Sequence, residues 1–173
     1  MAEPITLAQA KAQCRVTDSS EDALITSYIV AARDWVEQYT GHILVQRALT
    51  KTFSEFWDYL ELPYRPVVSI TNIAYTDTAG AAQTLLPGVL VATSYPYRIR
   101  PVDAWPAIQT YSPVVVTYTA GYAAGTEPQA LLQAILMLVS HYHTNRGAML
   151  EAPIQEIPLA VTSLCDRYRV PVM

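Results

Sequence analysis

The three histidines are the first side chains in this sequence that could bind a metal ion or transfer a proton. His141 and His143 lie two positions apart on a predicted helix, so their side chains point about 200° away from each other and cannot share a metal. His42 lies in a predicted loop. No HExxH motif, no cysteine partner and no carboxylate close in sequence accompanies them. The pattern therefore predicts solvated or capping histidines.

The carboxylates of FSEFWDYLEL are the second group that could do chemistry. Glu55, Asp58 and Glu61 could in principle supply a general acid and a general base. Charge runs of this kind more often form a solvated edge between strands. The sequence contains no GxSxG, no phosphate-binding loop and no GxGxxG. We therefore predict no catalytic residue, no cofactor and no metal.

Composition and charge indicate one folded domain of 173 residues. Half of the residues are hydrophobic and 15% are charged, which argues against extended disorder. A net charge of −4 argues against a broad basic surface for nucleic acid. Cys14 and Cys165 lack metal-like spacing and are predicted to be buried free thiols. No apolar run has the length of a membrane span and no signal peptide is recognisable, so the expected location is the cytoplasm or a particle assembled there.

The elements that would position these side chains centre on residues 113–147. Residues 114–119 alternate β-branched and aromatic side chains, a pattern typical of a strand. A helix is predicted from about Pro128 to Asn145, with Thr126 as N-cap and Gly147 as its end.

The apolar face of this predicted helix is unusually wide. Met137 and Leu138 extend it beyond a normal amphipathic stripe. Either the helix is the central helix of the domain, or another subunit covers part of it. The residues of the main stripe are Leu131, Leu132, Ile135, Leu136, Val139 and Tyr142.

Three further helices are predicted outside this stretch. Thr6 is a suitable N-cap for a helix over residues 7–14. A second helix spans about residues 20–39, with capping-box-like spacing of Ser19 and Asp22 at its start and Gly41 at its end. A short helix begins at Pro158.

Between the helices, residues 44–119 contain short β-rich segments separated by Pro, Gly and Asp. Asp77 to Gly80 is a predicted hairpin turn. In YPYRIR, Tyr95, Tyr97 and Ile99 face one side while the two arginines face the other, which indicates either an ordinary sheet core or an interface. The predicted fold class is α+β, with a helical frame and an antiparallel β insertion.

Four segments together resemble the head–tail connector proteins of tailed bacteriophages, also called adaptor or head-completion proteins. The resemblance covers both ends of the chain and its helical frame, and it leaves out the β-rich region. The segments are LAQAKAQCRV, SEDALITSYIVAARDWVEQYTGHIL, VVVTYTAGYAAGTEPQALLQAILMLVSHYHTNRG and IPLAVTSLCDRYRV.

The resemblance implies a structural protein of the virion neck, assembled in the host cytoplasm. About twelve copies would form a ring that docks below the portal protein and joins a downstream tail or stopper protein. DNA would pass through this ring without specific binding, and no membrane is involved. The chain would form one connector domain over residues 1–173, with 44–119 as an insertion and 152–173 as a docking segment.

The resemblance also assigns hypothetical contact residues. The expected subunit-interface residues are Arg33, Tyr95, Tyr97, Arg98, Met137, Leu138 and Arg146. The expected portal-docking residues are Pro158, Leu159, Leu164, Arg167, Tyr168 and Arg169.

Two alternatives remain open at the level of sequence. A small enzyme would gather Glu55, Asp58, His141 and His143 in a pocket with perturbed pKa values. A monomeric binding module would use the β insertion and would have an ordinary amphipathic stripe on its long helix.

Overall fold

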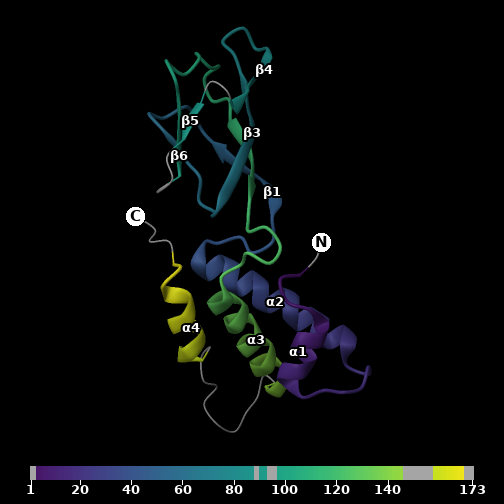
Figure 1. Cartoon of the computed structure of the whole chain (residues 1–173). Helices are drawn as coiled ribbons and strands as arrows, with labels where there is room; N and C mark the ends of the chain where they lie inside the picture. Colours follow the sequence, from purple (N-terminus) through teal and green to yellow (C-terminus); the bar gives the residue numbers. More distant parts are fainter. Residues whose placement is uncertain (1–2, 88–89, 93–96, 146–157, 170–173) are drawn as a thin grey trace. The chain divides into compact units, whose positions relative to one another are not determined.

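The computed structural model describes residues 3–87, 90–92, 97–145 and 158–169, and these form two compact units. One unit combines Met1–Val45 with Tyr122–Met173 and contains the helices, and the other is Gln46–Gly121 and contains the strands (Figure 1). We call them the helical unit and the β unit. Helices together with antiparallel sheets confirm the predicted α+β class.

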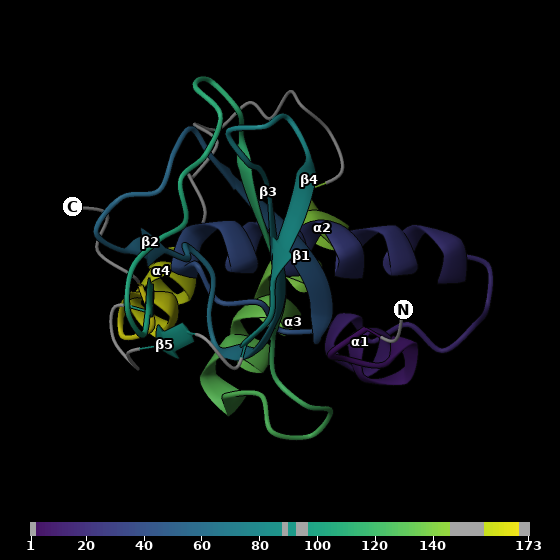
Figure 2. The ribbon, with the colours of Figure 1, turned by 90° about the horizontal axis from the view of Figure 1, so that it is seen from above.

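The helical unit is organised around its third helix. Its elements are α1 (Leu7–Cys14), α2 (Asp22–Thr40), α3 (Gln129–Thr144) and α4 (Leu159–Asp166). In the views of Figures 1 and 2, α3 lies between α1 and α4, and it contacts α1, α2 and α4. The buried residues of α3 are Leu131, Ala134, Ile135, Leu138 and Val139. A helix with neighbours on three sides needs an apolar face wider than one stripe.

The first helix begins as the sequence predicts. The Thr6 hydroxyl accepts the backbone N–H of Gln9, and the Gln9 side chain accepts the N–H of Thr6, which completes a capping box. Gly41 ends α2 in the left-handed region at φ 74°, as predicted.

The predicted capping box at the start of α2 is wrong. Glu21 is the N-cap residue and its side chain makes no capping hydrogen bond. The carboxylate of Asp18 accepts the backbone N–H of Ser20, while Asp22 pairs with Lys11 at 2.6 Å. The acid that was expected to cap the helix therefore joins α2 to α1.

The start of α3 also differs from the prediction. Pro128 is the N-cap and the helix begins at Gln129. The hydroxyl of Thr126 donates to the carbonyl of Ala123 in the preceding turn, so it does not cap the helix. The predicted stop at Gly147 lies outside the described residues; the last helical residue is Thr144.

Within its described residues, the β unit contains seven strands in two antiparallel sheets. The larger sheet has the order β1-β7-β3-β4 and the smaller has the order β2-β6-β5. The strands are β1 (Arg47–Phe53), β2 (Leu60–Glu61), β3 (Val67–Thr76), β4 (Ala82–Leu85), β5 (Leu90–Ala92), β6 (Arg98–Pro101) and β7 (Val114–Ala120).

The interior of the larger sheet follows from the alternation along β7. Val114, Val116 and Tyr118 are fully buried, while the residues between them are half-buried. Strand β7 is paired on both sides, with β1 and with β3. The predicted strand is confirmed, and its period of two selects the face that packs inward.

The hairpin between β3 and β4 turns at Asp77, as predicted. The N–H of Gly80 donates to the carbonyl of Asp77, and Gly80 adopts φ 81°, which favours glycine. The Asp77 carboxylate accepts hydrogen bonds from the Gln83 side chain and from the N–H groups of Ala79 and Ala81. The Gln83 contact is the largest cause of the lowered pKa of Asp77. One carboxylate thus holds the turn closed.

Candidate interaction surfaces

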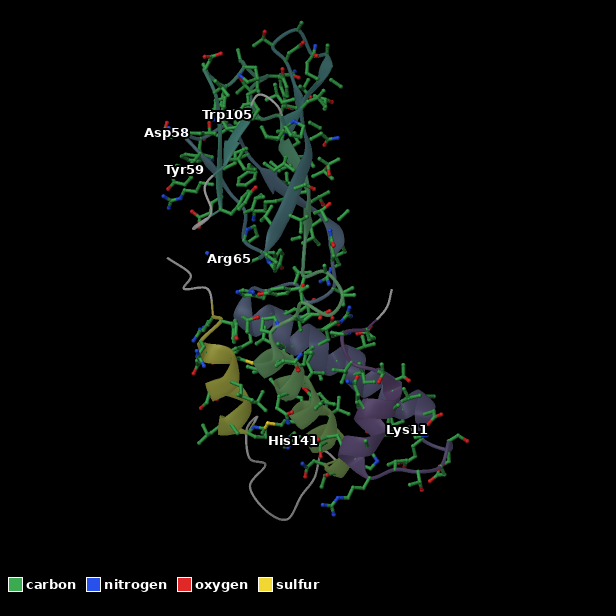
Figure 3. The ribbon with its side chains drawn as sticks, in the orientation of Figure 1. Lys11, Asp58, Tyr59, Arg65, Trp105 and His141 are labelled. Carbon is green, nitrogen blue, oxygen red and sulfur yellow. The ribbon has the colours of Figure 1, made fainter. Side chains whose placement is uncertain are left out.

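The histidines of α3 have separate structural partners. His143 Nε2 lies 2.8 Å from a carboxylate oxygen of Glu21, a residue 122 positions away in the sequence. His141, labelled in Figure 3, contacts the side chain of Asn145 through Nδ1 at 3.1 Å. The carboxylate partner of His143 is distant in sequence, and the contact depends on the packing of the start of α2 against the end of α3.

The remaining histidine is also part of a packed contact. His42 Nδ1 lies 2.8 Å from the Tyr122 hydroxyl, and the two rings are stacked with centroids 5.9 Å apart. Burial is the largest cause of the raised pKa of Tyr122. No group of three metal-ligating side chains occurs within the part of the chain that the structure describes.

The last helix, α4, is held to α2 by a polar and aromatic cluster. The Tyr39 hydroxyl donates to Asp166 at 2.7 Å, and this hydrogen bond is the largest cause of the raised pKa of Tyr39. The Tyr39 ring stacks on Trp35 at 4.8 Å, and the guanidinium of Arg169 lies 5.2 Å from the Tyr39 ring centroid. A cation over an aromatic ring adds a modest attraction at such an exposed position.

Some of the predicted portal-docking residues pack against the core of the helical unit, and others are exposed. Leu164 and Tyr168 pack against the helical core. Leu159 is 84% exposed, and Arg167 and Arg169 are exposed. Leu159 is therefore exposed at the start of α4, and the two arginines are exposed just after its end.

The subunit-interface candidates of the helical unit mostly make contacts within their own chain. Leu138 is fully buried and Met137 is partly buried against the same core. Arg33 Nε lies 3.3 Å from Glu3, and the guanidinium also contacts Asp34 at 2.9 Å. Arg146 and Tyr95 lie outside the described residues. The wide apolar face of α3 is thus explained by its central place in the helical unit, where Leu138 is covered by the chain itself.

The β unit exposes more large apolar side chains than the helical unit does. Trp57 is 57% exposed and Tyr59 is 43% exposed. The side chains of residues 55–59 line an open hollow of about 550 Å³. Asp58 also lines a second hollow with Trp105, and Figure 3 shows Asp58, Tyr59 and Trp105 on the same side of this unit. The other exposed large apolar residues of the β unit are Tyr64, Val68, Leu86, Val102 and Tyr111.

One cation in this region is already bound within the chain. The Arg98 guanidinium lies 4.1 Å from the Tyr59 ring centroid, and its Nε lies 3.0 Å from Glu61. Glu61 and Arg98 are directly opposite each other in the β2·β6 pair, which favours this contact. Ile99 is buried and Arg100 is exposed, as the alternation in YPYRIR predicts. Tyr97 is half-buried, and burial raises its pKa.

The two remaining carboxylates of the predicted acid/base group make no such contact. Glu55 and Asp58 are exposed, and within the described residues neither has an ion-pair or hydrogen-bond partner. The structure therefore brings together Glu61, Tyr59 and Arg98, and leaves Glu55 and Asp58 beside exposed Trp57. The sequence signal for this aromatic and acidic surface is the alternation of aromatic and acidic residues in SEFWDYLE.

The cysteines differ in burial. Cys165 is fully buried and burial raises its pKa to about 11, while Cys14 is half-buried. Both are free thiols, so the prediction holds for the buried Cys165 and is wrong for the burial of Cys14. Among the helices that the structure describes, none has the length and apolar character needed to cross a membrane.

One protein-family model and several solved structures resemble this α+β chain. The model of the phage gp6-like head–tail connector protein family matches residues 4–81, which are just under half of the chain. Among solved structures, a chain of the neck of an empty GTA particle, computed with C6 symmetry, is 28% identical with a TM-score of 0.80. The match covers 100% of this chain and 95% of that chain.

Two further structures support the same likeness. A chain from the virion of a native gene transfer agent (GTA) particle is 27% identical with a TM-score of 0.81, covering 98% of this chain and 92% of that one. A chain from the neck of a native GTA particle, computed with C12 symmetry, is 27% identical with a TM-score of 0.75, covering 100% and 94%. None of the curated proteins matches the chain. These findings confirm the resemblance to the head–tail connector family.

Proposed function

We propose that this protein is a structural head–tail connector of a tailed phage or phage-like particle. About twelve copies form a ring in the neck, below the portal protein, where the ring extends the DNA channel and joins the tail. The observation that carries this proposal is the likeness along 100% of the chain to chains from GTA necks, one of them computed with C12 symmetry. The family match in residues 4–81 supports it independently.

In this proposal residues 1–173 act as one connector domain, with 44–119 as a β-rich insertion. The ring is assembled in the host cytoplasm and resides in the virion neck. A weakly acidic chain of net charge −4 suits a channel that DNA crosses without being held, because the field around the protein repels the phosphates. No membrane takes part.

The proposed role requires no catalysis. His141, His143 and Glu61 have structural partners on different elements, and Glu55 and Asp58 lie on an open surface of the β unit. An acid/base mechanism needs two such groups in reach of one substrate atom. Each of the two histidines and Glu61 is held in a separate contact, and the connector proteins that this chain resembles are structural.

The portal contact is assigned to the C-terminal segment, residues 152–173. Within it Leu159, Arg167 and Arg169 are exposed on or just after α4. Arginine is enriched at protein interfaces, and an exposed large apolar side chain is a common contact group. Leu164 and Tyr168 support this surface from the inside by packing on the helical core.

The ring is tested by measuring native mass across a concentration series. The protein is studied alone and then mixed with the portal protein encoded by the same genome. We expect a closed species of about twelve copies in at least one condition. Monomers in both conditions would contradict the ring.

The portal contact is tested with substitutions that leave the helical core intact. Leu159→Asp combined with Arg167→Glu should abolish co-purification with the portal, because it removes the apolar side chain and reverses one charge. Ser163→Glu, at another exposed position of α4, is the matched control and should leave it unchanged. Equal portal binding by both variants would show that α4 is not the contact.

A further inference from the structure

We propose that the aromatic and acidic surface formed by Glu55, Trp57 and Asp58 binds an arginine side chain of the adjacent copy of this chain. This inference rests on the proposed ring and names one contact that would hold it together. The three residues lie in the segment that lines the open hollow at residues 55–59. Trp57 is more than half exposed.

The chain itself shows how such a surface binds a cation. Two residues further along the same segment, the Tyr59 ring and the Glu61 carboxylate together hold the guanidinium of Arg98. The ring supplies a negative face and the carboxylate supplies the opposite charge. Position 57 carries an aromatic ring with carboxylates at 55 and 58, so the segment repeats the same chemistry.

At this second position no cation of the chain is in contact with the ring or the carboxylates; Arg100 lines a hollow with Asp58 but forms no ion pair with it within the described residues. Within the described residues no cation lies over the Trp57 ring, and Glu55 and Asp58 have no ion-pair partner. An exposed indole beside two unpaired carboxylates suits contact with a partner's arginine, because tryptophan and arginine are the side chains enriched at interface centres. The surface is therefore complementary to a guanidinium on another chain.

Charge complementarity identifies the adjacent copy as the source. Two arginines of the helical unit, Arg15 and Arg167, are exposed and have no ion pair or ring contact within the described residues. They belong to a different unit from Trp57, so a contact between them joins two different surfaces. Contacts between different surfaces are the ones that close into rings of many copies.

The test is charge reversal followed by compensation, in the condition in which the wild-type chain forms rings. Asp58→Arg should raise the subunit concentration for half-assembly at least about tenfold, which corresponds to about 1.4 kcal/mol per contact. Adding Arg15→Glu or Arg167→Glu to the same chain should restore assembly, because each contact then regains opposite charges. The readout is the fraction of ring against monomer by native mass.

Two controls separate the contact from folding and from general charge effects. Thr78→Arg adds the same charge at an exposed position of the β unit and should leave assembly unchanged. Trp57→Ala should weaken assembly, whereas Trp57→Phe should retain most of it, since phenylalanine keeps an aromatic face. Circular dichroism of each variant verifies that the fold is retained.

The outcomes separate this inference from the proposed function. If the wild-type chain forms rings and Asp58→Arg forms them equally well, the inference is wrong and the ring stands. If Asp58→Arg abolishes assembly and neither arginine reversal restores it, the proposed pairing with the adjacent copy is wrong. The pairing is also wrong if Asp58→Arg forms rings normally and loses only its binding to another neck protein. If the wild-type chain forms no ring with or without the portal, the proposed function fails first.

Discussion

The helical unit and the β unit handle their large apolar side chains in opposite ways. In the helical unit, α3 contacts three other helices, and the exposed large apolar side chains are Leu24 and Leu159 among the described residues. In the β unit, Trp57, Tyr59 and Tyr111 reach into solvent beside a small core. Exposed apolar patches mark contact surfaces more reliably than wide helical stripes, which a chain can cover itself.

The difference assigns separate tasks to the two units. Burial in the helical unit stabilises the frame, because each fully buried leucine contributes about 1.5–3 kcal/mol. The exposed aromatic side chains of the β unit contribute little to stability but present large, rigid contact groups. We therefore expect mutations in the core of the helical unit to change folding, and mutations on the surface of the β unit to change assembly.

The largest contrast is expected between two leucines. Leu138→Ala should lower the free energy of unfolding by about 2–5 kcal/mol, because Leu138 is fully buried and its truncation leaves a cavity. Leu86→Ala is the matched control in the β unit; Leu86 is 65% exposed, so the change should stay within about 0.5 kcal/mol. Urea denaturation followed by circular dichroism measures both. Similar losses for the two variants would contradict the contrast.

Alkaline pH should destabilise the two units in different windows. Burial raises the pKa of Cys165 from 9.0 to about 11 and that of Tyr118 from 10.0 to about 12. An acid whose pKa is higher in the folded state stabilises the fold below its unfolded pKa, and this contribution disappears as pH rises through the folded pKa. Each shift corresponds to about 2–3 kcal/mol. The helical unit should begin to weaken above pH 9 through Cys165, and the β unit above pH 10 through Tyr118. The raised pKa values of Tyr122 and Tyr142 add to the weakening of the helical unit above pH 10.

The pH ranges in which the two units lose stability can be told apart with single substitutions and with spectroscopic signals specific to each unit. Cys165→Ala should flatten the pH dependence of the helical circular dichroism signal, and Tyr118→Phe should flatten that of the β unit. In a Trp35→Phe background, the remaining tryptophans, Trp57 and Trp105, report only the β unit. Unchanged pH slopes in both variants would show that these groups do not govern alkaline unfolding.

A smaller effect is expected at the buried carboxylate of the helical unit. Glu37 is 3% exposed and accepts the backbone N–H of Leu44 at 2.7 Å. Glu37→Ala should cost about 1–3 kcal/mol because that N–H would lose its partner. Glu37→Gln keeps an acceptor oxygen and should cost less. If the alanine and glutamine variants unfold at the same urea concentration, the hydrogen bond is not the reason for burying this residue.

The smallest of these effects on stability is expected at the N-terminus of α1. Thr6→Ala removes the hydroxyl of the capping box and should cost about 0.5–2 kcal/mol, whereas Thr6→Ser should be nearly neutral. Amide hydrogen exchange in residues 7–10 measures the local change. Protection that is equal in the alanine and serine variants would show that the cap does not stabilise this helix.

Local patterns predicted most of the elements of both units. The alternation along residues 114–119 identified β7, and Thr6, Gly41 and the Asp77–Gly80 turn were found by their turn and cap chemistry. These features depend on residues close in sequence, where backbone geometry and side-chain type are directly linked.

The misses came from contacts between distant residues. Asp22 pairs with Lys11 and does not cap α2, and His143 contacts Glu21 at the start of α2. The wide face of α3 could be covered either by this chain or by another one, and periodicity alone does not distinguish these. The cation bound at Tyr59 likewise required the β2·β6 pairing, which fixes Arg98 opposite Glu61.

The ring is the central claim, and imaging the purified chain together with its portal protein tests it most directly. Two-dimensional averages from electron microscopy should show a closed ring of about twelve copies attached to the portal, with symmetry that can be counted in end-on views. Single copies bound irregularly, or no attachment at all, would contradict the account.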